Sequence, residues 1–275
     1  MVKISKNKII YNAIIALCVG VILYNSYILL SWYIDKNKNQ EEIKEIAEIT
    51  KVQEVEDTEN IILINPPDEK VESNNDYWNY IKMPLIDANV QELKTINSDT
   101  VGFVSVRGTN INYPVVQASD NNYYLTRSFK KAKNRAGWIF MDYRNNSSSL
   151  NKNTIIYGHN MIDGTMFGTL KNILKSDWIT NKDNYIINLS TENQNTMWQV
   201  FSVYVTTELE YYIKTEFESS EKYEEWLREM LRRSEYNFNA TVNANDKVLT
   251  LSTCYGASSD NKRVVMQAKL IKSDS

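Results

Sequence analysis

Near its C-terminus the chain reads VLTLSTCYGASSDNKRVVMQAKL, residues 248–270. An apolar run typical of a β-strand ends at Cys254, a polar segment comes next, and Arg263 begins a second apolar run. If the segment 255–262 is a hairpin loop, the two runs are antiparallel strands and Arg263 lies across from Cys254 at one end of a sheet. The stretch therefore predicts a β-rich domain that presents a thiol and a guanidinium at the same sheet edge.

The composition narrows the classes of protein to which the chain can belong. Its 275 residues suit one or two domains, 43% hydrophobic and 24% charged residues are ordinary for a globular protein, and a net charge of -3 predicts no nucleic-acid partner. The two cysteines, Cys18 and Cys254, and the single histidine, His159, are too few for a zinc site of Cys and His ligands. The sequence has no glycine-rich phosphate loop, so we expect neither a metal nor another cofactor.

Residues 9–34 form a long uncharged stretch, IIYNAIIALCVGVILYNSYILLSWYI, that ends before Asp35. At ~1.5 Å per residue, a helix of this length crosses a hydrocarbon core of ~30 Å. Lysines in the preceding residues 1–8 favour a cytoplasmic N-terminus. A buried core helix and a cleaved signal peptide are the alternatives, but the apolar run exceeds the usual signal-peptide core of about 7–15 residues and no clear cleavage site comes after it. We therefore predict a cytoplasmic tail at 1–8, a single transmembrane signal anchor at 9–34, and an extracellular remainder at the cell membrane.

This predicted topology separates the two cysteines. Cys18 lies within the span, where a small apolar residue is the ordinary interpretation, so it cannot form a disulfide with Cys254 across the membrane. Cys254 is then the one thiol outside the cytoplasm. A free cysteine in an exported domain is unusual and indicates a reactive thiol.

The segment after the predicted span differs in composition from the rest of the chain. Residues 35–75 are rich in Glu, Lys, Asn and Ile, with helical spacing of the isoleucines between residues 41 and 56 and a break at NPPD, residues 65–68. We interpret 35–75 as a linker or stalk with a partly helical start, and 76–275 as the folded domain.

Strand signals dominate the domain at 76–275. Two short helices at 77–81 and 90–96 precede the strands, and an amphipathic helix at 219–233, with a Ser cap and an acidic first turn, is expected to pack on the sheet. The fold class is therefore mainly β: a closed or nearly closed eight-stranded β-barrel with peripheral helices, after an N-terminal transmembrane helix. The eight expected strands are 102–106, 111–117, 138–141, 154–157, 185–189, 197–206, 247–253 and 263–271.

His159 is the candidate partner for the thiol of Cys254. A cysteine thiol with an ordinary pKa of about 8.5 is mostly protonated at neutral pH, and a nearby imidazolium or guanidinium favours the reactive thiolate. Both residues directly follow predicted strands, and strand ends on one rim of a barrel bring such residues together. Arg263 would add hydrogen bonds to a carbonyl or an oxyanion. Taken singly, each residue has a plainer interpretation: a structural or surface histidine, a buried small cysteine and a surface arginine.

These residues resemble the signature of a known family. The segment TLSTC at 250–254, with Arg263 downstream and YGH at 157–159 upstream, is similar to the signature of sortases. The resemblance covers about residues 77–272, and a long helix placed before the cysteine strand is similar to class B sortases. Four further segments also resemble class B: 93–102, 108–117, FMDYR at 140–144 and 213–217.

Sortases are membrane-anchored cysteine transpeptidases of Gram-positive bacteria, so the resemblance implies an enzyme of this kind. It implies that Cys254 attacks a Thr carbonyl in the C-terminal sorting motif of a secreted protein, and that an amine of a peptidoglycan precursor resolves the thioacyl intermediate. His159 would protonate the leaving amine and later deprotonate the incoming one, while Arg263 would steady the substrate or the oxyanion. By the same resemblance the motif is bound by Asn121, Leu125, Tyr157, Tyr212, Ile213 and Ser252.

The chain departs from some class B sortases at Tyr255, where they carry an acidic residue directly after the cysteine. Two other functions are compatible with the residues. One is a membrane-anchored cysteine peptidase that only hydrolyses, and the other is a non-catalytic surface β-barrel that binds a partner. An amine acceptor changes the product of a transpeptidase but not that of a peptidase, whereas a binding module does not depend on Cys254.

Overall fold

A computed structural model describes residues 6–55, 60–68, 74–207, 210–254 and 262–274. The chain divides into two compact units, residues 1–45 and 46–275, which are described separately. The predicted hairpin loop at 255–262, with Tyr255, lies outside the described residues except for its last position.

The described residues of the first unit all belong to one long helix, α1. It runs from Lys6 to Thr50 and is long and apolar enough to cross a membrane, judged by length and composition. The helix ends at Thr50 because Lys51 adopts a left-handed φ of 40°. The prediction of helical structure as far as residue 56 is therefore wrong, since Gln53–Val55 forms strand β1.

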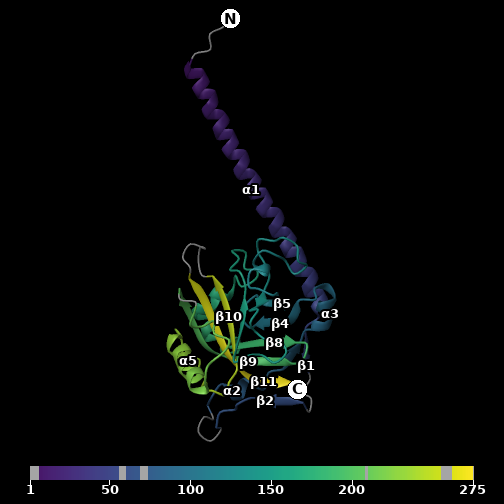
Figure 1. Ribbon diagram of the computed structural model, residues 1–275, viewed down its shortest axis with the longest axis vertical. Helices are drawn as coiled ribbons and strands as arrows, with labels where there is room; N and C mark the ends of the chain where they lie inside the picture. The colour runs from purple at the N-terminus through teal and green to yellow at the C-terminus, as the bar shows by residue number, and fades with distance from the viewer. Residues whose placement is uncertain (1–5, 56–59, 69–73, 208–209, 255–261, 275) are drawn as a thin grey trace. The chain divides into compact units, whose positions relative to one another are not determined.

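Eight strands of the second unit form a closed β-barrel, as predicted (Figure 1). Their hydrogen-bonded order is β10-β7-β6-β5-β4-β8-β9-β11, and pairing of β10 with β11 closes the ring. Each strand matches one predicted strand, with shifted ends. The bounds are β4 Thr100–Val106, β5 Asn112–Val116, β6 Phe140–Met141, β7 Asn153–Tyr157, β8 Ile186–Thr191, β9 Asn195–Thr206, β10 Val248–Cys254 and β11 Arg263–Asp274.

Three short strands add to the eight that were predicted. β1 pairs with β3, Leu85–Asp87, and β2, Ile61–Leu63, pairs with the far end of β11. β1 and β2 fall in the segment 35–75 that was expected to be a linker, so from Ile46 onward this segment belongs to the same compact unit as the barrel. A strand of three residues is too short to show an alternating pattern, which is why the sequence did not reveal it.

Helix α5, Ser220–Arg233, packs its apolar face on the barrel, as expected (Figure 1). Ser219 caps the helix by accepting a hydrogen bond from the backbone N–H of Lys222. The buried face, which includes Trp226 and Met230, joins one apolar cluster with side chains of β9, β10 and β11. The remaining described helices are short, and the first two match predicted helices: α2 Tyr77–Tyr80, α3 Val90–Ile96, α4 Ser176–Thr180, and the 3-10 turns η1 Tyr123–Leu125, η2 Leu170–Leu174 and η3 Lys182–Asn184.

Candidate active site

Two strand pairings bring the predicted catalytic residues to one rim of the barrel. β7 and β10 run parallel, with Tyr157 and Ser252 as Cα partners. Parallel strands end at the same edge of a sheet, so His159 and Cys254, each two residues beyond that pair, lie at the same rim. β10 and β11 run antiparallel, and Cys254 is the Cα partner of Arg263. The pairing of these two positions agrees with the antiparallel arrangement expected from the sequence.

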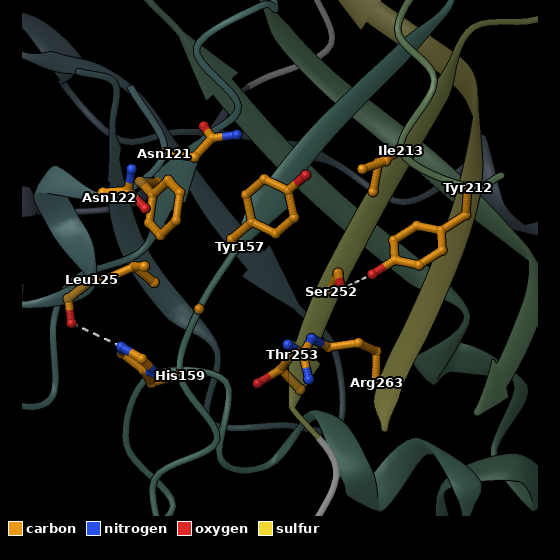
Figure 2. Close-up of a pocket in the computed structure, with 12 residues that line it drawn as sticks. Asn121, Asn122, Leu125, Tyr157, His159, Tyr212, Ile213, Ser252, Thr253 and Arg263 are labelled. Carbon is orange, nitrogen blue, oxygen red and sulfur yellow. Dashed lines mark hydrogen bonds between the residues drawn. The ribbon is translucent and has the colours of Figure 1, made fainter. Parts of the chain in front are cut away.

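A pocket of about 300 Å³ lies at this rim (Figure 2). It brings together all six of the predicted motif-binding residues with His159 and Arg263. Cys254 is described by its backbone, as the last residue of β10, directly after the pocket residue Thr253. Figure 2 shows His159 and Arg263 on opposite sides of Thr253. Four lining residues were not identified from the sequence, although each lies next to a predicted residue or within the FMDYR segment: Asn122, Phe140, Gly158 and Thr253.

The ring of His159 is oriented by a backbone carbonyl. Its Nε2 lies 2.8 Å from the carbonyl oxygen of Leu125, an atom that can only accept a hydrogen bond. The contact is a hydrogen bond when Nε2 carries the hydrogen, and it leaves Nδ1 as the other polar atom of the ring. The preceding Gly158 leaves no room for a side chain, because a Cβ at this position would lie 2.7 Å from Cγ of the buried Phe167 ring. The chain is thus closely packed at Gly158, and the next residue, His159, lines the pocket.

The pocket is mainly apolar and aromatic, with a few polar groups held by buried partners. The hydroxyl of Tyr212 and Oγ of Ser252 are 2.9 Å apart, and the hydroxyl of Tyr157 donates to Oδ2 of Asp142, 2.9 Å away. Burial alone would raise the pKa of Asp142, but the Arg144 guanidinium and further hydrogen bonds hold this pKa below its ordinary value. Burial, together with the charge of Asp142, raises the pKa of Tyr157, so this phenol stays protonated and donates at neutral pH.

Arg263 lies partly exposed at the edge of the pocket. One of its guanidinium nitrogens, Nη1, donates to the carbonyl of Lys262 at 3.1 Å. A guanidinium at this edge, at the strand position paired with Cys254, is placed to donate to a carbonyl bound in the pocket. Among the residues that the structure describes, no three His, Cys, Asp or Glu side chains gather as metal ligands would.

The closed eight-stranded barrel, with a cysteine, a histidine and an arginine at one rim, defines the architecture of a sortase. The chain belongs to the sortase family, because the sortase domain model matches residues 104–271. Enzymes of this family are cysteine transpeptidases, so the alternative of a non-catalytic binding module is set aside.

Within the family, the chain is similar to sortases B. It is 40% identical to Sortase B of Listeria monocytogenes over 183 residues, and this match covers 66% of this chain and 74% of the relative. It is 42% identical over 183 residues to Sortase B of Staphylococcus aureus, with the same coverage of 66% and 74%. The crystal structure of sortase B from Bacillus anthracis matches with a TM-score of 0.69 and 36% identity, covering 87% of this chain and 99% of that chain. Sortases B anchor proteins to the cell wall, and the class B resemblance of the sequence is confirmed.

Proposed function

We propose that this chain is a single-pass membrane enzyme that cleaves the C-terminal sorting motif of secreted proteins after Thr and transfers them to an amine of peptidoglycan. The observation that carries the proposal is the pocket in which His159 and Arg263 flank Thr253, directly before Cys254. An apolar pocket with a few convergent polar groups suits an extended peptide. Membership of the sortase family supplies the reaction class.

In the proposed reaction the thiolate of Cys254 attacks the carbonyl carbon of the motif's Thr. The resulting oxyanion accepts hydrogen bonds from Arg263. The His159 imidazolium donates its Nδ1 proton to the leaving amine, the C–N bond breaks, and a thioacyl enzyme remains. The incoming amine then gives a proton to the neutral His159, attacks the thioacyl carbon and releases the thiolate. The bond between Nε2 and the Leu125 carbonyl supports this assignment, because it reserves Nδ1 for proton transfer.

The six predicted motif-binding residues are proposed to contact the peptide on either side of the reacting carbonyl. In Figure 2, Asn121, Leu125 and Tyr157 lie on one side of the pocket, and Tyr212 and Ile213 lie on the other. The hydrogen bond between Tyr212 and Ser252 links that second side to β10. A motif bound between the two sides would present its Thr carbonyl to Cys254 at the rim.

We propose that α1 anchors the enzyme, with a cytoplasmic tail at 1–8, a span at 9–34, a linker at 35–75 and an extracellular catalytic domain at 76–275. The length and apolar character of α1 support a span, and the N-terminal lysines support the orientation. Only residues 35–45 of this linker lie outside the compact unit that holds the barrel, because that unit begins at Ile46.

The test is a peptide-library cleavage assay on the full-length chain in detergent, read by mass spectrometry with and without added amines. We expect cleavage after Thr, a product that carries the added amine, and no turnover in Cys254→Ala. Cleavage that yields only free acid with every amine would favour the peptidase alternative. Turnover by Cys254→Ala at the wild-type rate would refute the cysteine mechanism.

A further inference from the structure

A buried carboxylate behind the pocket is not used by the proposed reaction. Asp142 follows β6 within the FMDYR segment and is 0% exposed. Its carboxylate receives the fork of Arg144, with Nε 2.8 Å from Oδ1 and Nη2 2.7 Å from Oδ2. The backbone N–H of Arg144 also donates to Oδ1, at 3.0 Å. A bidentate, charge-assisted pair of this kind has a well-defined geometry.

Asp142 also holds one wall of the pocket. Its Oδ2 accepts hydrogen bonds from the Tyr157 hydroxyl, at 2.9 Å, and from Nδ2 of Asn121, at 3.0 Å. The Asn121 amide is held from its other side as well, because its Oδ1 accepts from the backbone N–H of Tyr143 at 3.0 Å. Two pocket residues from different segments of the chain are therefore positioned by one carboxylate oxygen.

The facing wall is the irregular segment 211–214, which belongs to no strand and is held by side-chain donors. Trp226 Nε1 donates to the carbonyl of Tyr211 at 2.6 Å. Asn153 Nδ2 donates to the carbonyls of Tyr212 and Lys214, at 2.9 and 2.8 Å.

The carbonyl of Ile213 is held by the partner of Asp142. Nη2 of Arg144, the nitrogen that bonds the carboxylate, also donates to this carbonyl at 3.0 Å. A single ion pair thus connects Asn121 and Tyr157 on one side of the pocket to Ile213 on the other, the arrangement that Figure 2 shows for these three side chains.

We propose that the Asp142–Arg144 pair is a positioning element that sets the spacing of the two pocket walls and thereby the affinity and selectivity for the sorting motif. The inference rests on the proposed function, because it takes this pocket as the site of the motif. A pair that served stability alone would not need to bond residues on both walls. Neither residue is a catalytic residue, since both act through Asn121, Tyr157 and Ile213.

The test uses two substitutions in the full-length chain in detergent. Asp142→Asn keeps the shape but loses the charge that draws the Arg144 fork. Arg144→Lys keeps the charge but replaces the planar fork, which bonds the carboxylate and the Ile213 carbonyl together, by a single ammonium. With a sorting peptide that the wild type cleaves, we expect each substitution to raise KM roughly tenfold and to leave kcat within about twofold of the wild-type value. This pattern indicates weaker substrate binding with an unchanged chemical step.

A matched control is available in a second ion pair whose carboxylate is buried, although its lysine is exposed. The carboxylate of Asp76, which is 6% exposed, accepts hydrogen bonds from Nζ of Lys182, and each of its two oxygens lies 3.0 Å from that nitrogen. The pair joins the residue before α2 to η3. Asp76→Asn and Asp142→Asn should both lower the unfolding temperature, but Asp76→Asn should leave KM unchanged. An unchanged KM in Asp142→Asn and Arg144→Lys, with the same loss of thermal stability as the control, would overturn the proposal.

Hydrogen–deuterium exchange decides the inference without any substrate. In Arg144→Lys we expect the amides of 211–214 to exchange several-fold faster than in the wild type, and Asp76→Asn to leave them unchanged. Equal exchange in wild type and Arg144→Lys would overturn the proposal. If the wild type cleaved no sorting peptide, the proposed function would fail, while the exchange rates would still show whether the pair positions this wall.

Discussion

The hydrogen bond between Tyr212 and Ser252 joins the irregular pocket wall to the strand that ends at Cys254, and its contribution is measurable. The Tyr212 hydroxyl and Ser252 Oγ are 2.9 Å apart, and the two residues are 1% and 2% exposed. In Tyr212→Phe the buried Ser252 hydroxyl loses this partner, which costs about 1–3 kcal/mol of unfolding free energy. For a folded unit of this size, a loss of about 2 kcal/mol lowers Tm by about 4–8 °C.

The assay is a double-mutant cycle on the full-length chain in detergent, read by thermal unfolding. Tyr212→Phe and Ser252→Ala remove the same hydrogen bond, so the double variant should cost less than the sum of the single costs. We expect a difference of about 1 kcal/mol, since the double variant leaves neither polar group of the bond behind. Single costs that add fully would refute the reasoning, because they would show that the two hydroxyls do not interact.

Three further predictions concern Arg263 at the rim, the Asp142–Arg144 pair and helix α5. Arg263→Lys should lose most of the cleavage activity although it keeps the charge, because a planar fork is replaced by a single ammonium; near-normal activity would assign Arg263 a structural role. The pKa of Asp142 is lowered below its ordinary 3.8, so its charge contributes stability above that value and the contribution is lost as pH falls through the folded pKa. The difference in Tm between wild type and Asp142→Asn should therefore be constant near neutral pH and shrink below about pH 4, and a difference that persists in acid would contradict this. Ser219→Ala removes the α5 cap and should lower the free energy of unfolding by about 1 kcal/mol, measured by thermal unfolding. KM should stay unchanged, and a changed KM would show that the effect is not confined to the helix end.

The strands of the barrel were predictable because their signals are local. Seven of the eight core strands carry their own run of apolar and β-branched residues, and the run before Cys254 is long enough to be recognised without its partners. β6, Phe140–Met141, was recognisable only as part of the longer apolar run 138–141. β11 continues to Asp274 beyond the expected end at residue 271, through the polar Lys272 and Ser273. This extension depends on pairing with β9 and β2, which a single segment does not reveal.

By itself, the sequence determined which residues are available for chemistry. One histidine, a cysteine after TLST and an arginine at the next strand leave few alternatives, and a scarce residue type is recognisable without knowing its neighbours. The tertiary structure decided how those residues are held. Leu125 is 34 positions from His159, and Asp142 reaches Asn121 across 21 positions and Tyr157 across 15, while Arg144 reaches Ile213 across 69. Periodicity reports which face of an element is buried, but the partner of a buried polar group depends on the register between distant strands and on barrel closure. For this reason FMDYR was recognisable as a motif, whereas the bonds that Asp142 and Arg144 make to both pocket walls became visible only in the folded chain.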